Sequence, residues 1–154
     1  MHTFQITRRC LPHWQQLGSI YFITWRCKPG LTLGQEERQI TLTTLHHWDG
    51  LKWNLLVAVV MPDHVHVLAQ PLPRPEGGVF DLAEILHSIK RHSARRINQL
   101  RGTQGPLWQE ERYDRIVRDE AEFLEKWNYI RNNPVKGGLA KSPEDYPWLH
   151  EKHI

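Results

Sequence analysis

The stretch that decides the fold is WNLLVAVVMPDHVHVLAQ, residues 53–70. Residues 53–61 are almost all apolar and rich in valine, which predicts a buried, central β-strand. The Pro62-Asp63 pair predicts a tight turn, and residues 64–70 continue as a second apolar strand. The stretch therefore predicts an antiparallel hairpin at the centre of a sheet.

The second predicted strand opens with two histidines, His64 and His66. Because side chains at i and i+2 point to the same face of a strand, both imidazoles aim at one point. Val65 and Val67 then point the other way, into a core. This arrangement offers two nitrogen ligands to one divalent metal. A His-x-His pair alone is a weak signal, and it gains weight from a second segment, NYIRNNP at residues 128–134.

The flanking segments predict the other elements. We expect a strand at residues 19–26, a helix at 35–48, a helix from the N-cap Asp81 to about Leu100, a strand within 107–117 that is clearest at 113–117, and a helix from Asp119 to about Asn132. The order matches the split βαβ pattern of a ferredoxin-like α+β fold, an antiparallel sheet with helices on one face, followed by one more helix. We expect a single domain over residues 1–154, with a core at about 19–139 and an irregular tail at 140–154.

Helical spacing in the last predicted helix places Phe123, Leu124, Trp127 and Ile130 on a core-facing stripe. Tyr129 and Asn133 lie on the other side, four residues apart, where a phenol nucleophile and an amide ligand could act together. The alternative is a half-exposed surface tyrosine. Asn133 precedes a proline, which disfavours helical geometry, so we expect it just past the last turn.

Basic residues cluster on the second predicted helix. The chain has a net charge of +3, and residues 85–109 contain no acidic residue. This stretch predicts contacts with a nucleic-acid backbone, although each cation taken alone could belong to a solvated helix face. The predicted DNA-binding residues are Lys90, Arg91, Arg95, Arg96 and Arg101.

The cysteine content and the length of the apolar runs indicate where the protein is located. The two cysteines show no Cys-x-x-Cys spacing, which fits a reducing cytoplasm. We expect no signal peptide and no membrane association, since the longest apolar run, residues 55–61, is too short to span a bilayer. A structural zinc site built from Cys10, Cys27 and the two hairpin histidines is an alternative that nothing in the spacing favours. Four other histidines, His46, His47, His87 and His92, are expected at the surface or in packing roles.

Taken together, MPDHVH at residues 61–66, WQEERYDRIVRDE at 108–120 and YIRNNPVKGGL at 129–139 resemble the single-tyrosine HUH transposases. The resemblance is greatest to the REP-associated tyrosine transposases, and Ser88-Ile89-Lys90-Arg91 adds to it. The matching pieces occur in the family's order and spacing from about residue 19 to 139.

The resemblance implies a ferredoxin-like fold and strand transfer on single-stranded DNA, in particular on repeat hairpins. By position, His64 and His66 match the metal ligands, Tyr129 matches the nucleophile, and Asn133 matches a third, amide ligand where many relatives have glutamine. The implied cofactor is Mg²⁺ or Mn²⁺, and the implied intermediate is a 5′-phosphotyrosine. The family also implies a bacterial, nucleoid-associated protein that acts as a monomer, with a helix-swapped dimer as the alternative.

Two other functions remain open at this point. The chain could be a metal-dependent phosphoesterase that forms no covalent intermediate, with Tyr129 as a structural residue. It could also be a hairpin-binding module that has lost cleavage, although the presence of both histidines and of Tyr129 argues against this.

Overall fold

The computed structural model describes residues 18–153. Its elements are β1 (Ile20–Cys27), α1 (Gln35–His47), β2 (Trp53–Val60), β3 (His64–Pro71), α2 (Leu82–Arg101), β4 (Trp108–Val117), α3 (Glu120–Lys136), the 3-10 helix η2 (Pro143–Asp145) and β5 (Leu149–Glu151). The strands form one antiparallel sheet in the order β4-β1-β3-β2-β5. The predicted ferredoxin-like α+β fold is confirmed, with β5 as an added edge strand.

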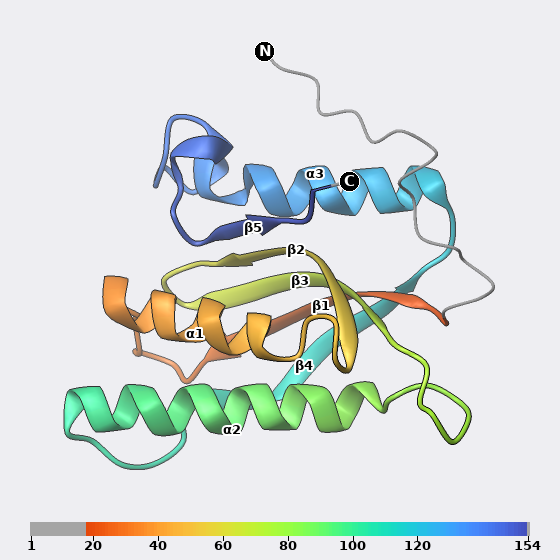
Figure 1. Ribbon diagram of the computed structural model, residues 1–154. Coiled ribbons are helices and arrows are strands. Elements are labelled where there is room, and N and C mark those ends of the chain that lie inside the picture. The colour runs from red at the N-terminus through yellow and green to blue at the C-terminus, as the bar shows by residue number, and fades with distance from the viewer. Residues whose placement is uncertain (1–17, 154) are drawn as a thin grey trace.

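The sheet is covered on both faces (Figure 1). Helices α1 and α2 pack on one face, over a core that includes Trp25, Trp53 and Ile89. Helix α3 packs on the other face, over a second core that includes Phe22 and Trp127. The prediction of helices on one face therefore holds for α1 and α2, and the additional helix takes the opposite face. Within residues 18–153, no helix combines the length and apolarity needed to cross a membrane.

The hairpin of β2 and β3 forms the middle of the sheet, as the sequence predicts. The turn closes where the Met61 N–H donates to the His64 carbonyl oxygen at 2.8 Å. Strand β3 also pairs with β1, so that Thr24 lies opposite His66 and Arg26 lies opposite His64. Both histidines therefore have a neighbour from β1 on the same face of the sheet.

Helix α3 is longer than the sequence predicts, because it continues through Pro134 to Lys136. Pro134 is buried, and Asn133 lies inside the helix rather than past its last turn. A proline removes one N–H donor, but this loss is small near a C-terminus, where carbonyl groups lack helical partners anyway. The end is closed by the Gly137 N–H, which donates to the Asn133 carbonyl at 2.9 Å, and by the Leu139 N–H, which donates to the Pro134 carbonyl at 2.8 Å.

The tail that we expected to be irregular contains η2 and β5. The Tyr146 hydroxyl donates to the Val60 carbonyl at 2.6 Å, which ties the tail to the end of β2. Arg131 of α3 donates to Glu144 at 2.7 Å and to Glu151 at 2.5 Å. These polar contacts join segments with little apolar periodicity, so hydrophobic patterning gave no sign of them. Strand β4 also starts earlier than its clearest predicted part, at Trp108.

Candidate metal and tyrosine site

The predicted site residues come together from β3 and α3. The Nε2 atom of His64 lies 3.3 Å from Oδ1 of Asn133, although the two residues are 69 positions apart. The imidazole rings of His64 and His66 are 4.7 Å apart between centroids. Strand alternation and the position of α3 over the sheet thus bring two imidazole rings and one carboxamide to the same place.

Neighbouring side chains fix the orientation of both imidazoles. The Nδ1–H of His64 donates to the Asp63 carboxylate at 2.7 Å, which leaves the lone pair of Nε2 facing Asn133. His66 Nδ1 and Thr24 Oγ1 are hydrogen-bonded at 2.7 Å. Outer contacts of this kind are what hold metal-ligating histidines in one tautomer. Asp63, which the sequence predicts in the turn, therefore also orients His64.

Burial and nearby charge keep the imidazole of His66 uncharged, and an imidazole that binds a metal must be uncharged. Burial, helped by the nearby His64 and Arg26, lowers the pKa of His66 to about 3. The hydrogen bond from His64 lowers the pKa of the Asp63 carboxyl. At neutral pH the His66 ring is therefore uncharged and the Asp63 side chain is an anion, so both groups suit a bound cation.

The geometry of His64 and Asn133 fits a divalent ion. Two neighbouring ligands that each bind a metal at about 2.1–2.2 Å lie roughly 3.0–3.5 Å apart, and the observed separation is 3.3 Å. Both atoms are lone-pair donors in the tautomer set by Asp63. The geometry is therefore compatible with the prediction that His64, His66 and Asn133 hold a divalent metal ion.

Tyr129 lies beside these residues on α3, one helical turn before Asn133. Its ring centroid is 5.3 Å from that of His66 and 5.9 Å from that of Phe22, in edge-to-face geometry. The side chain is still 44% exposed, so its hydroxyl can meet a ligand from solvent. The tyrosine thus has a fixed position at the edge of the site and remains accessible.

The sequence analysis missed four residues around the site. Thr24 orients His66, and the buried Phe22 stacks with the same imidazole at 5.8 Å between centroids. Arg26 is exposed opposite His64, and Lys126 Nζ lies 5.0 Å from the centre of the Phe22 ring. The alternation of Phe22, Thr24 and Arg26 along β1 was a usable signal, but only the pairing register shows which histidine each residue meets.

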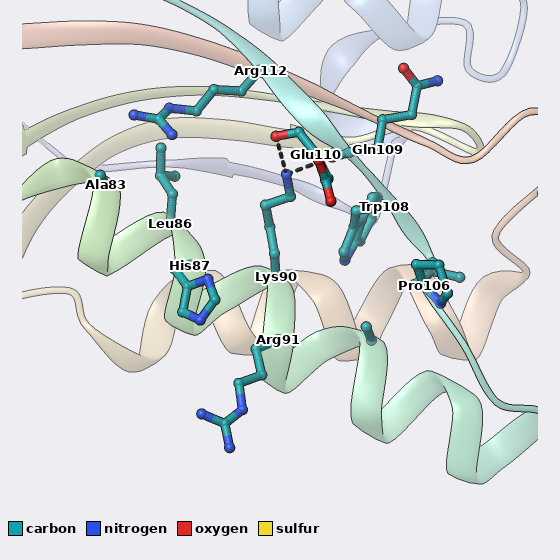
Figure 2. Close-up of a pocket in the computed structure, with 12 residues that line it drawn as sticks. Ala83, Leu86, His87, Lys90, Arg91, Pro106, Trp108, Gln109, Glu110 and Arg112 are labelled. Atoms are coloured by element: carbon teal, nitrogen blue, oxygen red, sulfur yellow. Dashed lines mark hydrogen bonds between the residues drawn. The ribbon is translucent and has the colours of Figure 1, made fainter.

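The basic residues of α2 lie on the other side of the sheet, next to the edge strand β4. A groove of about 480 Å³ separates α2 from β4 (Figure 2). Lys90, Arg91 and Arg112 line this groove, and Arg91 is exposed. Lys90 points across it and donates to the backbone carbonyl of Gln109 at 2.7 Å. Burial lowers the pKa of Lys90, with a contribution from the like charge of Arg112.

The other predicted DNA-binding residues divide into two groups. Arg95 and Arg96 are exposed on α2. Arg101 forms an ion pair with the buried Glu37 of α1 and donates to the Thr32 carbonyl. Arg101 therefore joins α1 to α2, and its charge is already compensated within the protein.

The alternative zinc site is not formed by Cys27. This cysteine is buried in the core on the α1 and α2 side of the sheet, whereas His66 faces α3. Burial raises the pKa of the Cys27 thiol to about 11, which disfavours the thiolate that zinc binding needs. Cys10 lies outside the described residues.

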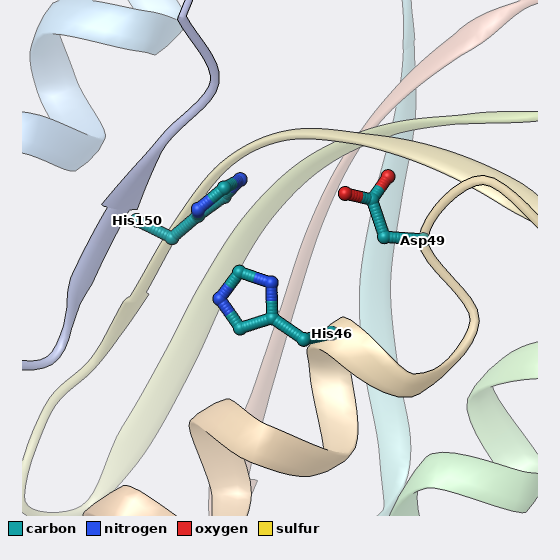
Figure 3. Close-up of side chains that lie close together, drawn as sticks. All are labelled: His46, Asp49 and His150. Carbon is teal, nitrogen blue, oxygen red and sulfur yellow. The ribbon is translucent and has the colours of Figure 1, made fainter.

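A second group of ligand-type side chains lies elsewhere (Figure 3). His46, Asp49 and His150 each offer one ligand atom, and these atoms lie within 4.8 Å of one another. The sequence analysis assigned His46 to the surface or to packing and gave no role to the other two. Their sequence separation of about a hundred residues left no local motif that could have indicated the cluster.

Comparisons with known proteins agree with the observed fold. The chain is similar over 141 residues to a curated REP-associated tyrosine transposase of Haemophilus influenzae, with 26% identity over 85% of this chain and 78% of the relative. A solved REP-associated tyrosine transposase bound to a REP hairpin superposes with a TM-score of 0.70 at 21% identity, covering 90% of this chain and 80% of that one. A transposase structure from Deinococcus radiodurans gives a TM-score of 0.48 at 23% identity, over 73% and 88%.

A family model matches the chain over the segments that carry most of the sequence motifs. The family described as "Transposase IS200 like" matches residues 23–133, which run from β1 through both histidines and Tyr129 to Asn133. The match covers most of the chain and includes His64, His66, Tyr129 and Asn133. The chain therefore belongs to the IS200-like transposase family, a family of DNA-processing enzymes.

Proposed function

We propose that this chain is a metal-dependent endonuclease and strand transferase for single-stranded DNA that acts on repeat hairpins through a covalent 5′-phosphotyrosine at Tyr129. The single observation that supports this most strongly is the meeting of Tyr129 and Asn133 of α3 with His64 and His66 of β3. A phenol beside a set of neutral metal ligands is the arrangement that phosphoryl transfer to tyrosine requires.

His64, His66 and Asn133 are the residues that would hold Mg²⁺ or Mn²⁺. A divalent ion bound there supplies a positive charge that polarises the scissile phosphate and offsets the negative charge of the transition state. Because all three ligands would be neutral, none of them cancels that charge. Asp63 and Thr24 keep the two imidazoles turned toward the site through their hydrogen bonds.

In the chemical step, the oxygen of Tyr129 forms a bond to phosphorus while the bond from phosphorus to the 3′-oxygen breaks. The tyrosine loses its proton, and the released 3′-oxygen takes one up. The 5′-phosphate then remains on the tyrosine, which preserves one phosphodiester bond. A 3′-hydroxyl from another strand end reverses the reaction and seals the DNA without ATP.

The DNA in this proposal contacts both the site and the edge strand β4. Arg26 and Lys126 place positive charge beside the site, and Arg91 and Arg95 do so on α2. Strand β4 lies at the edge of the sheet, where the groove of α2 and the β1 surface meet. A hairpin as ligand is consistent with the solved relative, which is bound to a REP hairpin.

The decisive experiment uses Tyr129→Phe, which removes one hydroxyl and keeps the ring that packs near Phe22. Wild-type protein and the variant are incubated with 5′- and 3′-labelled repeat hairpins and Mn²⁺, and the products are separated on a denaturing gel. We expect the variant to bind the hairpin but to give neither cleavage nor a protein–DNA adduct.

Tyr113→Phe is the matched control, because Tyr113 is also exposed and also contacts Phe22. This control should cleave and form the adduct. An adduct that persists in Tyr129→Phe would move the nucleophile to another tyrosine, with Tyr113 the first to test. Cleavage without an adduct would favour the hydrolytic phosphoesterase, and a wild type that binds without cleaving would favour the binding module.

A further inference from the structure

The cluster of His46, Asp49 and His150 lies on the sheet face opposite the proposed catalytic site. His150 of β5 pairs with Ala58, whose side chain belongs to the core under α1 and α2. His66 pairs with Val59, whose side chain belongs to the core under α3. Because neighbouring strand positions face opposite sides, the cluster and the catalytic site are separated by the sheet.

The two histidines of the cluster come from different elements and already contact each other. His46 belongs to the last turn of α1, and its ring lies 4.4 Å from that of His150 between centroids. The Asp49 side chain points from the α1–β2 connection toward the same space (Figure 3). The three ligand atoms lie within 4.8 Å of one another, so small side-chain rotations would bring them to the spacing of a tetrahedral site, roughly 3.5 Å.

The backbone of Leu55 orients two of the three side chains. The Nε2–H of His150 donates to the Leu55 carbonyl at 3.3 Å, which selects the tautomer with its lone pair on Nδ1. The Leu55 N–H donates to Oδ1 of Asp49 at 2.9 Å. A histidine that donates its second N–H to a backbone carbonyl is the usual support for a metal ligand. One peptide segment therefore holds an imidazole and a carboxylate at once.

We propose that His46, Asp49 and His150 form a binding site for Zn²⁺ that joins β5 to the end of α1. Two imidazoles and one carboxylate favour zinc over Mg²⁺, which prefers oxygen ligands and water. A water molecule would complete four-coordination. The ion would act as a cross-link that fastens the C-terminal strand to the body of the domain. This site is independent of the proposed DNA chemistry.

A variant of Lys152 distinguishes a zinc site from a cluster of side chains that only pack together. Its ammonium group donates to Oδ1 of Asp49 at 3.1 Å and also to Asn54. The positive charge competes with a cation for the same carboxylate. If the cluster binds zinc, Lys152→Met should raise its affinity for zinc, whereas loss of a purely structural ion pair would only lower the stability of the protein.

The experiment starts from a His64→Ala, His66→Ala protein, so that the catalytic site cannot contribute metal. Bound zinc is measured by elemental analysis after equilibration with ZnCl₂ and dialysis, and Tm is recorded with and without zinc. We expect the His150→Ala variant to bind one zinc ion fewer per chain. Its Tm should no longer rise when zinc is added. His47→Ala is the control: it removes the histidine next to His46, whose ring contacts Trp48 rather than the cluster, and should change neither readout.

An unchanged zinc content in His150→Ala would contradict the proposal, as would a starting protein that retains no zinc. If His150→Ala does not fold, Lys152→Met decides. A several-fold tighter zinc Kd in that variant, measured by competition with a chromophoric chelator, would support the site, and an unchanged or weaker Kd would overturn it. Cleavage of hairpin DNA by the wild-type chain tests the proposed function separately, since neither outcome alters the other.

Discussion

At the scale of single residues, neighbouring side chains orient the candidate metal ligands. Thr24 is the clearest case, because its hydroxyl is hydrogen-bonded to His66 at 2.7 Å and fixes the imidazole from behind. Thr24→Val keeps the shape and removes the hydroxyl. We expect DNA cleavage to fall about 10- to 100-fold with hairpin binding unchanged, as found when outer contacts to metal ligands are lost.

A gel assay of cleavage rate against Mn²⁺ concentration checks the Thr24→Val prediction, with Thr43→Val as the matched control. Thr43 is exposed on α1, and its hydroxyl accepts a hydrogen bond only from Gln39, at 3.3 Å, among the contacts of the described residues. Equal rates for Thr24→Val and the control would show that His66 needs no such support.

Asn133 gives a second test at this scale. Asn133→Ala removes the carboxamide whose oxygen lies 3.3 Å from His64 Nε2, and we expect it to require about 10- to 100-fold more Mn²⁺ for half-maximal cleavage. Asn133→Gln retains an amide oxygen and should stay within a few-fold of wild type. An alanine variant with an unchanged metal requirement would remove Asn133 from the ligand set.

At the scale of elements, α2 presents basic residues to solvent along one side. Arg91 and Arg95 are both exposed, and each phosphate contact with a single strand contributes about −0.7 to the slope of log K against log salt. The double variant Arg91→Ala, Arg95→Ala should bind hairpin DNA more weakly, with a slope shallower by about 1.4 for contacts to single-stranded DNA and about 1.8 for contacts to the duplex stem. Fluorescence anisotropy at several salt concentrations measures this slope, and an unchanged value would place the DNA elsewhere.

Arg101 of the same helix stabilises the fold through its ion pair with Glu37, and this contribution depends on pH. The Arg101 guanidinium lowers the pKa of the Glu37 carboxyl, so this pair stabilises the fold above the unfolded pKa, about 4.3, and the contribution is lost as pH falls through the lower folded pKa. Arg101→Ala should lower the free energy of unfolding by about 1–3 kcal/mol at pH 7, because the buried Glu37 carboxylate loses its cationic partner and keeps the hydrogen bond from the Gly34 N–H.

Urea titrations at pH 7 and pH 3 measure the effect of Arg101→Ala, with the exposed Arg95→Ala as control. The difference from wild type should shrink at pH 3, where Glu37 is protonated in the unfolded chain. A loss of stability that is equal at both pH values would mean that the side chain acts through packing rather than charge.

At the scale of the whole molecule, local patterns predicted most of the architecture. The valine-rich hairpin, the strand alternation of His64 and His66, and the helical spacing of Trp127 and Tyr129 are properties of neighbouring residues, and all were readable from the sequence. Contacts between distant segments were not. The register that sets Thr24 opposite His66 is an example, since only the paired strands define it.

The same limit explains the errors at the C-terminal end. The continuation of α3 through Pro134 runs against the local preference of a residue that precedes proline, and the proline is buried in the fold. Strand β5 has only three residues and is fixed by long-range polar contacts, such as that between Arg131 and Glu151. Short segments of this kind carry too few apolar residues for a periodic signal.

The two margins of the sheet have a consequence for how the chain behaves in concentrated solution. One margin ends in β5, which is too short to template another strand. The other is β4, which pairs with no further strand among residues 18–153 and exposes charges of both signs, among them Glu110, Glu111, Arg112 and Asp114. We expect a single sedimenting species over a wide range of protein concentration, and a concentration-dependent dimer would point instead to exchange of α3 between chains.

DNA and neighbouring protein chains would both approach the charged strand β4. Substitutions in this strand would therefore change solubility and DNA affinity together. Neutralising Glu110, Glu111 and Asp114 would strengthen the attraction of the strand for phosphate, and it would also remove the repulsion that keeps bare strand edges apart. The acidic residues of β4 would thus lower the affinity for DNA. They would also oppose edge-to-edge association of β4 strands from different chains.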